Sequence, residues 1–221
     1  MIDTDFLKLS YLSSQVLGDG TVRNDKRIDI RHSSKTRDYV EVKRDLAIQL
    51  GFHVGEITEH TWLGSLGEHS VCGFSISRIE QCLLNASAET LVEQLDPMGL
   101  LLWWLDDGCL VVHEKKNGTS VSRFGYLGTE AFDQLTNQRL AQVLRAKFGL
   151  ETTVHIDRGG IVSPDATYYR LYFSATSMRA FIDLVRPWLH LVPEFLRYKL
   201  NMDYRPNRLS TSAEYARLYN F

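Results

Sequence analysis

"LSSQVLGDG", residues 12–20, ends a predicted helix on a carboxylate, Asp19, that has a glycine on either side. Apolar residues recur at helical spacing over residues 4–18, and Gly20 is a natural point for the helix to stop. The carboxyl end of a helix carries partial negative charge, so an acid placed there costs about 0.3–1 kcal/mol unless a cation offsets it. The stretch therefore predicts a positively charged group close to this acid.

A second stretch, "LLLWWLDDG" at residues 100–108, repeats this pattern and places Asp107 over Asp19 when the halves of the chain are aligned. Hydrophobic patterning around each stretch predicts the same order of elements in each half: helix, strand, strand, helix, strand, strand, helix. An internal duplication of about 90–100 residues is the best account of this repeat. We therefore expect two repeats, residues 1–95 and 96–221, packed as one unit.

The individual elements follow from hydrophobic periodicity and from breaks at glycine, proline and asparagine. In the first half we expect helices over 4–18, 38–52, 78–85 and 88–95, and strands over 27–32, 54–62 and 69–77. In the second half we expect helices over 96–108, 130–150 and 177–189, and hairpins over 109–128 and 152–175, the first turning near Asn117-Gly118.

The composition is that of an ordinary globular protein, with 221 residues of which 44% are hydrophobic and 24% charged. No apolar run approaches the roughly 18 residues that a membrane helix needs, and the start "MIDTDFLKLS" lacks the features of a signal peptide. We expect an intracellular protein with no membrane partner, in a cytoplasmic or organellar compartment. Cys72, Cys82 and Cys109 are widely spaced, so we expect buried thiols rather than disulfides or a zinc site.

The formal net charge of −2 argues only weakly against a nucleic-acid partner, because the distribution of charge matters more than its sum. Basic residues gather between Arg23 and Arg44 and again in the last quarter, with acids interspersed, so a mixed solvated surface is the alternative. In "RIDIRH" Ile28 and Ile30 alternate with charged residues. This alternation predicts a strand with one buried face and one charged face.

The two acid-ended helices predict a metal site. Ser13, Ser14 and Gly18 put small residues along one side of the first helix, which allows another helix backbone to approach closely. Two carboxylates at two negative helix ends repel each other unless divalent cations lie between them, and Mg²⁺ suits a site of few carboxylates plus phosphate oxygens. A calcium loop is disfavoured because "GDGTVRND" lacks alternating acids and a closing glutamate. One Asp-Gly pair is usually a plain turn, but two at matching positions favour a shared function.

The paired stretches resemble the two motifs of the LAGLIDADG homing endonucleases in their single-chain form. The flanking segments "IRHSSKTRDYVEVK", "FGYLGTEAF" and "RPWLHLVPEFLRYKL" are also similar to segments of that family, so the resemblance covers nearly the whole chain. It implies an α+β fold, a pseudo-twofold αββαββα repeat whose two antiparallel sheets form a saddle on the DNA major groove. It also implies a monomer that breaks both strands of a long DNA target by metal-dependent phosphodiester hydrolysis.

The resemblance implies roles for individual residues. Asp19 and Asp107 would hold Mg²⁺ against the scissile phosphates, one for each strand, with two or more divalent ions in all and with Mn²⁺ or Ca²⁺ able to replace Mg²⁺ in binding. Gly18 and Asp106 are the neighbouring positions of this metal site, and we expect Asp106 to pack or cap its helix rather than to act as a ligand. Lys199 matches a basic residue that assists catalysis in the family; the alternative is an ordinary surface lysine.

The two halves differ at other positions near this site. The first half has no lysine in the stretch that corresponds to the one around Lys199, and only Arg78 lies nearby in sequence. Arg31 aligns with a polar position that organises water near the metals, whereas its partner in the second half is Gly128. We therefore expect the two DNA strands to be cut at unequal rates.

Sequence readout would come from outward positions of the strands, because arginine reads guanine and asparagine reads adenine in the major groove. Two other functions remain open on the same fold: an RNA-binding maturase that assists intron splicing, and a DNA-binding regulator that does not cut. The predicted DNA contacts are Arg23, Asn24, Lys26, Arg27, Asp29, Arg31, Lys35, His113, Lys115, Lys116, Asn117, Ser120, Ser122, Arg123, Arg158, Tyr168 and Arg170.

Overall fold

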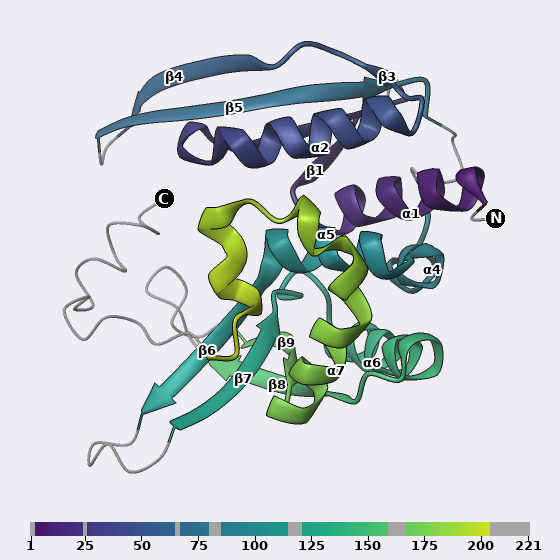
Figure 1. Ribbon diagram of the computed structural model, residues 1–221, viewed down its shortest axis with the longest axis vertical. Helices are drawn as coiled ribbons and strands as arrows, with labels where there is room; N and C mark the ends of the chain where they lie inside the picture. Colours follow the sequence, from purple (N-terminus) through teal and green to yellow (C-terminus); the bar gives the residue numbers. More distant parts are fainter. Residues whose placement is uncertain are drawn as a thin grey trace.

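Two helices occupy the centre of the molecule and separate two units of sheet and helix (Figure 1). A computed structural model describes residues 3–23, 26–64, 67–79, 85–114, 121–158 and 167–203. The central helices are α1 (Thr4–Leu17) and α5 (Pro97–Asp107), which pack against each other. Each of the two predicted motif stretches therefore forms the end of one central helix.

The first sheet has five antiparallel strands in the order β1-β2-β5-β3, and β4 also pairs with β5. Helix α2 packs on β2 and β5, and helix α4 packs on α1. The bounds in this half are β1 (Gly20–Arg23), β2 (Arg27–Ser33), a 3₁₀ turn η1 (Ser34–Thr36), α2 (Arg37–Gln49), β3 (His53–Val54), β4 (Thr58–Gly64), β5 (Gly67–Ser77) and α4 (Ala88–Gln94).

The second sheet has four antiparallel strands in the order β6-β7-β9-β8, which repeats the order of the first. Helix α6 packs on β8 and β9, and α7 packs on β7. The bounds in this half are β6 (Gly108–Glu114), β7 (Val121–Leu127), α6 (Gln134–Phe148), β8 (Thr152–Arg158), β9 (Thr167–Phe173), α7 (Ala175–Val185) and the 3₁₀ segments η2 (Arg186–Leu191) and η3 (Glu194–Leu200). The predicted duplicated α+β fold with two antiparallel sheets is confirmed.

Several predicted boundaries shift in the structure. The expected helix over 78–85 is not formed at its start, where Arg78 has a φ of +63°, and residues 80–84 lie outside the described residues, as does the turn at Asn117-Gly118. The strand expected over 54–62 is split into β3 and β4. Helix α6 begins late because Asp133 caps it by accepting a hydrogen bond from the Thr136 N–H.

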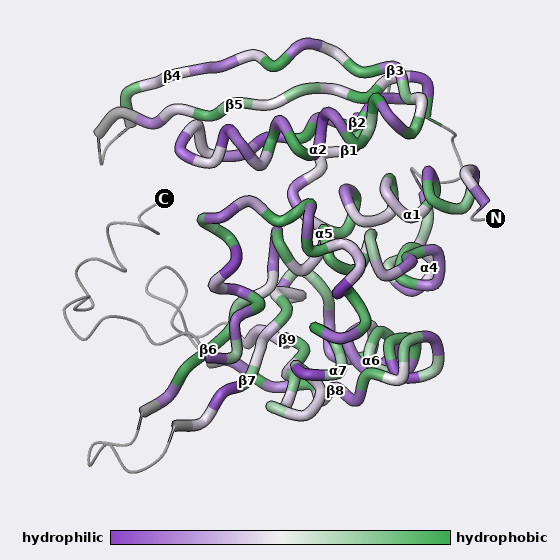
Figure 2. Tube along the Cα trace, in the orientation of Figure 1, coloured by the Kyte–Doolittle hydropathy of each residue, from purple (hydrophilic) through white to green (hydrophobic). Residues whose placement is uncertain are grey.

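The core is centred on α5, where every residue from Met98 to Leu105 is buried. Trp103 and Trp104 are among the largest fully buried side chains. The strands around α5 bury one face each, and Figure 2 shows the corresponding mixture of hydrophobic and hydrophilic positions along β5. No helix among the described residues is long and apolar enough to cross a membrane.

The prediction of buried thiols holds for one of the two cysteines that the structure describes. Cys72 is buried in β5, whereas Cys109 is exposed. Cys109 is exposed because it lies on the opposite face of β6 from the buried Leu110. Cys82 lies outside the described residues.

Candidate active site

Helices α1 and α5 approach closely because a glycine lies at each end of their contact. A Cβ added to Gly99 would lie 2.3 Å from Ser10 Oγ, and one added to Gly18 would lie 2.3 Å from Asp106 Oδ2. The first contact joins residues nearer the helix starts and the second joins the carboxyl ends, so the two helices run parallel. Of the predicted small residues, Gly18 lies at this contact, whereas Ser13 donates a hydrogen bond to Gln94 of α4. The contact of α1 with α5 brings both acid-bearing helix ends to one place.

The start of this contact is a buried hydrogen-bonded joint. The hydroxyl of Ser10 donates to Asp96 Oδ1 and accepts from the Asp96 N–H, whose nitrogen lies 2.8 Å away. The same Asp96 Oδ1 accepts from the Gly99 N–H at 2.8 Å and so caps α5. The Asp96 side chain thus pairs one backbone N–H at the start of α5 and also links α5 to α1.

At the other end of the contact, Asp19 and Asp107 both have raised pKa values. Loss of water around the Asp19 carboxyl, followed by the charge of Asp106, raises the pKa of Asp19 to about 6. Burial raises the pKa of Asp107 to about 7, and the charges of Asp106 and Asp19 contribute. The charge of Asp19 thus reaches Asp107, and a nearby cation would favour the ionised form of both acids.

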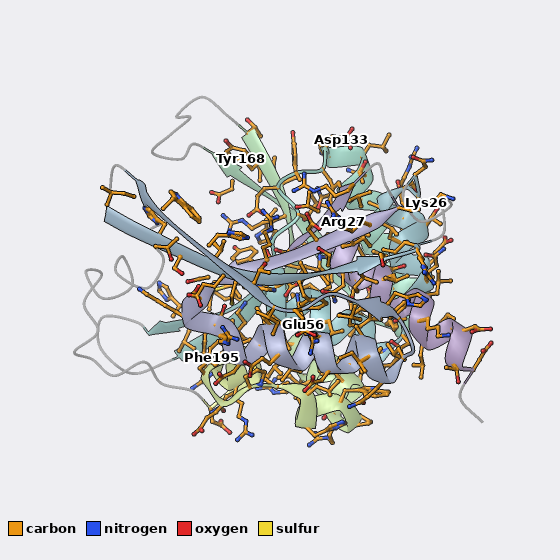
Figure 3. The ribbon with its side chains drawn as sticks, turned by 90° about the horizontal axis from the view of Figure 1, so that it is seen from above. Lys26, Arg27, Glu56, Asp133, Tyr168 and Phe195 are labelled. Carbon is orange, nitrogen blue, oxygen red and sulfur yellow. The ribbon has the colours of Figure 1, made fainter. Side chains whose placement is uncertain are left out.

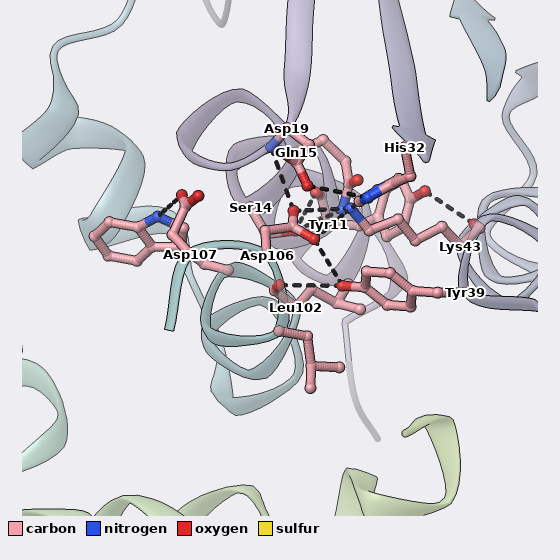
Figure 4. A network of polar contacts seen from close by, with 12 residues as sticks. Tyr11, Ser14, Gln15, Asp19, His32, Tyr39, Lys43, Leu102, Asp106 and Asp107 are labelled. Carbon is pink, nitrogen blue, oxygen red and sulfur yellow. Dashed lines mark hydrogen bonds and ion pairs between the residues drawn. The ribbon is translucent and has the colours of Figure 1, made fainter. Parts of the chain in front are cut away.

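The charge of Asp106 is buried and paired. Its side chain is fully buried, and Lys43 Nζ, equally buried, donates to Oδ1 at 2.7 Å and to Oδ2 at 2.8 Å. The Tyr39 hydroxyl also donates to Asp106 Oδ1 at 2.9 Å (Figure 4). Because α5 carries Asp106 and α2 carries Lys43 and Tyr39, this ion pair joins the two halves of the chain. Asp106 is thus a helix-packing acid, as expected.

His32 connects this ion pair to Asp19. Its Nδ1 lies 3.1 Å from Asp19 Oδ2, and its Nε2 lies 3.0 Å from Lys43 Nζ. Burial and the charge of Lys43 lower the pKa of His32 to about 3, so the ring is neutral. Ligand atoms of Asp19, His32 and Asp106 all lie within 4.8 Å of one another, which is close enough to share a cation. The ammonium group of Lys43 already supplies one.

Asp107 has different neighbours. The indole of Trp103, one turn earlier on α5, donates to Asp107 Oδ2 at 3.2 Å. Lys199, on η3, donates through Nζ to the carbonyl oxygens of Leu105 at 2.7 Å and Asp106 at 3.3 Å. Burial lowers the pKa of Lys199, whereas the nearby acids favour its charged form. Lys199 is therefore a partly buried cap on the carboxyl end of α5, beside Asp107, rather than a surface lysine.

On the first sheet the predicted DNA-contacting residues surround one carboxylate. The Asp29 side chain is 5% exposed and faces Arg23 Nε at 2.9 Å and Arg27 Nε at 3.2 Å, with Arg31 Nη2 at 3.6 Å. Burial opposes its ionisation, but hydrogen bonds from Ser75 and Arg23 and the charge of Arg27 keep the pKa of Asp29 below its ordinary value. Asp29 is thus a buried carboxylate that forms ion pairs with the three arginines, whose side chains remain partly exposed.

On the second sheet the corresponding face is aromatic. Arg170 pairs with Asp157 and lies with its guanidinium carbon 4.8 Å from the centre of the Tyr126 ring. Tyr172 stacks on His155 with 4.2 Å between the ring centres. The single arginine described on this part of the sheet is therefore already paired with an acid and an aromatic ring.

The remaining predicted contacts lie at several levels of exposure. In Figure 3 Lys26, Arg27 and Tyr168 lie in the upper half of the view, and Glu56 and Phe195 lie in the lower half. Lys26, Lys35, His113 and Ser122 are exposed, Arg123 and Tyr168 are partly buried, the backbone of Arg158 belongs to β8, and Asn24, Lys115, Lys116, Asn117 and Ser120 lie outside the described residues.

Sequence analysis missed His32, Lys43 and Trp103 as site residues. Lys43 lies in α2 among the buried positions of that helix, and a charged residue on an apolar stripe requires a buried partner. His32 continues the inward alternation of Ile28 and Ile30 along β2. Both signals are visible in the sequence, but neither identifies the partner across the helix pair.

Comparison with known proteins gives a consistent result. The model of the LAGLIDADG DNA endonuclease family matches residues 14–181. A segment of Protein RecA from Mycolicibacterium fallax is 28% identical over 189 residues, which cover 80% of this chain and 41% of that protein. The chain thus spans about two fifths of the length of this relative.

Among solved structures, the homing endonuclease I-WcaI bound to its DNA recognition sequence has a similar fold. The TM-score is 0.65 at 16% sequence identity, and the match covers 92% of this chain and 90% of that chain.

Proposed function

Because this chain belongs to the LAGLIDADG DNA endonuclease family, we propose that it is a site-specific homing endonuclease that makes a double-strand break in a long DNA target by metal-dependent hydrolysis. The pair Asp19 and Asp107 carries this proposal. These acids lie at the adjoining carboxyl ends of parallel helices, and both have raised pKa values. Two acidic groups are thus gathered at one place, and a divalent cation there would balance their charge.

The donor set at the helix ends suits hard divalent cations. We assign Asp19 and Asp107 as ligands, because the carboxylate of Asp106 is fully buried against Lys43 and Tyr39. Gly18 contributes close packing, since any side chain at its Cβ would meet Asp106. A Mg²⁺ ion held by Asp19 and Asp107 would supply a Lewis acid for an attacking water and positive charge for the leaving oxygen. Mn²⁺ and Ca²⁺ have related oxygen-ligand preferences and serve as alternative probes.

The chain itself contributes positioning and charge around those ligands. His32 and Trp103 each place an N–H donor next to one carboxylate, at 3.1 Å and 3.2 Å. Lys199 brings positive charge to the end of α5, where it favours the ionised form of Asp107. We propose that Lys199 assists cleavage from this position, near the reacting phosphate.

Duplex DNA would lie across the outward faces of the two sheets. The exposed parts of Arg23, Arg27 and Arg31 supply positive charge and donors for guanine or phosphate. Asp29 then organises these side chains and makes no base contact of its own. Both halves lie in one chain, so we propose that a monomer binds the target and that the repeat boundary falls between residues 95 and 96.

The proposal is tested by incubating the protein with a duplex library in Mg²⁺ and in a chelator. The wild type should leave double-strand breaks at one sequence, only with metal. Asp19→Asn and Asp107→Asn should each abolish double-strand cutting, with at most slow nicking, while binding persists because neither acid reads bases. Asp38→Asn, which changes an exposed acid of α2, is the matched control and should cut normally.

Three outcomes contradict the proposal. If DNA cutting persists in both Asn variants, the assignment of Asp19 and Asp107 as metal ligands is wrong. A wild type that cuts no duplex but binds and splices a structured intron RNA would identify a maturase. A sequence-specific complex that is never cut, with or without metal, would identify a regulator.

A further inference from the structure

The two acids differ in how their side chains are held. Asp19 is approached by a residue from the sheet, His32 on β2, whereas Asp107 is approached by Trp103 of its own helix. Both contacts involve Oδ2 of the carboxylate. In each case a ring nitrogen lies within hydrogen-bond distance of that oxygen, at 3.1 Å for His32 and 3.2 Å for Trp103. Figure 4 shows the two carboxylates with these separate partners.

The contact between His32 and Lys43 fixes which nitrogen of His32 carries the proton. A lysine ammonium group donates hydrogen bonds and cannot accept them, so Nε2 of His32, 3.0 Å from Lys43 Nζ, must be the acceptor. The proton of the neutral ring then lies on Nδ1, directed at Asp19 Oδ2 at 3.1 Å. The buried pair of Lys43 and Asp106 thus determines the tautomer of His32 and, through it, the donor that Asp19 receives.

This arrangement exists on one side only. Gly20 and Gly108 each follow one of the acids, and they pair with Ile30 and Leu127 on the next strand, so Ile30 corresponds to Leu127. His32 lies two residues after Ile30 and therefore corresponds to Thr129. The Thr129 hydroxyl donates to Asn137 and not to an acid of the site. Likewise Gln15 occupies the position of Trp103, four residues before the acid, and its amide donates to Ser14.

We propose that His32 and Trp103 are positioning residues, each serving one carboxylate and therefore one strand of the DNA target. This inference rests on the proposed function. His32 would orient Asp19 for cleavage of one strand, and Trp103 would orient Asp107 for cleavage of the other. Partners that orient a metal ligand typically change activity 10- to 100-fold when removed.

The experiment compares variants on a target duplex labelled separately at each 5′ end. His32→Leu removes the donor to Asp19 and should slow one strand about 10- to 100-fold more than the other. Trp103→Phe removes the indole N–H together with part of a fully buried ring system, and it should slow the opposite strand. His32→Asn keeps a short N–H donor and should restore much of the rate lost in His32→Leu.

Thr129→Val is the matched control, because it removes a buried polar group from the corresponding place in the second half without touching Asp19 or Asp107. It should change both strands alike. If His32→Leu and Trp103→Phe slow both strands equally, or slow the same strand, the assignment is wrong. Thermal unfolding of each variant separates loss of positioning from loss of fold.

A second measurement does not depend on cutting. The ¹⁵N shifts of the imidazole ring of His32, assigned by their loss in His32→Asn, should show a neutral ring protonated on Nδ1 in the metal-free protein. In Lys43→Met, the proton of the His32 ring should no longer be confined to Nδ1. A ring protonated on Nε2 would overturn the proposal even if the enzyme cuts DNA as expected. If the tautomer is as expected but no duplex is cut, the proposed function fails, and so does the strand assignment.

Discussion

The carboxyl ends of α1 and α5 are equivalent by duplication but are built from different chemistry. At the end of α1, Gly18 has no side chain, and the space beside it is filled by the side chain of Asp106, which pairs with Lys43. At α5 the helix end is capped by Lys199 from a distant segment. The two acids thus occupy the same position in each half, whereas the groups that contact them differ.

The divergence extends to the helices that flank each end. Gly51 and Gly149, both with positive φ, follow α2 and α6 and align the two helices. By that alignment Ala141 takes the place of Lys43, and Asn137 takes the place of Tyr39. The second half therefore has a neutral network, in which Asn137 bonds to Thr129, where the first half has an ion pair. The charge pair needs two differences between the halves: an aspartate, Asp106, at the position of Gly18, and a lysine, Lys43, at the position of Ala141.

The largest expected effect comes from breaking the ion pair in the first half. Lys43→Met leaves the fully buried Asp106 carboxylate without its cation and should destabilise the fold by about 3–5 kcal/mol in urea unfolding. Adding Asp106→Ala should recover most of that loss, because it restores the neutral pattern of the other half. If the double variant is no more stable than Lys43→Met, the pair is not the reason for the difference.

Crowding at Gly18 should have the next largest effect. Gly18→Ala places a methyl group 2.3 Å from Asp106 Oδ2, which Lys43 and Tyr39 hold in place, and should cost about 1–3 kcal/mol. The same substitution in an Asp106→Ala background should be far milder. Equal losses in both backgrounds, measured by thermal unfolding, would mean that Asp106 does not set the close approach.

Burial of the Asp19 and Asp107 carboxyls, together with the charge of Asp106, should appear as a dependence of stability on pH. Their pKa values, raised from 3.8 to about 6 and about 7, mean that the folded protein binds protons more readily than the unfolded chain. The associated stability is fully present below about pH 4 and is lost as pH rises through 6 to 7. At pH 8 in a chelator, the free energy of unfolding of Asp107→Asn should exceed that of the wild type by about 1 kcal/mol, after allowance for the partial exposure of this carboxyl.

The control for that measurement is the same pair of proteins at pH 4–5, where the difference should shrink because the wild-type carboxyl is already neutral. Saturating Mg²⁺ should also remove the stability difference at pH 8, since the cation balances the negative charge of the wild-type carboxylates. An Asn variant that is less stable than the wild type throughout would contradict the crowding of charge at the helix ends.

The smallest expected effect compares the two sheets. The Arg31 side chain is 54% exposed, whereas that of Arg170 is 28% exposed and paired with Asp157. Affinity for DNA should fall steeply with salt, and Arg31→Gln should reduce the slope by about one ion while Arg170→Gln changes it little. Equal changes in slope would mean that both sheets meet phosphate in the same way.

The sequence was sufficient for the order of elements, the duplication and the close approach of the two motif helices, because periodicity and small residues are local signals. It also predicted a packing role for Asp106, whose side chain fills the space beside Gly18. The links of Lys43 to Asp106 and of His32 to Asp19 were not predicted, because each joins residues from different elements. The placement of Asp29 beneath the arginines was missed for the same reason, since it depends on Ser75 from a neighbouring strand.

The joint between Ser10 and Asp96 has a consequence for how the protein unfolds. Ser10 belongs to the first helix, and Asp96 is the first residue of the predicted second repeat, yet each satisfies the other's buried polar atoms. Separating the repeats would leave those atoms unpaired and expose the apolar surface of α5. Neither repeat can therefore melt alone at low cost, and we expect one cooperative unfolding transition for the chain, with two separately expressed halves recovering it only when mixed.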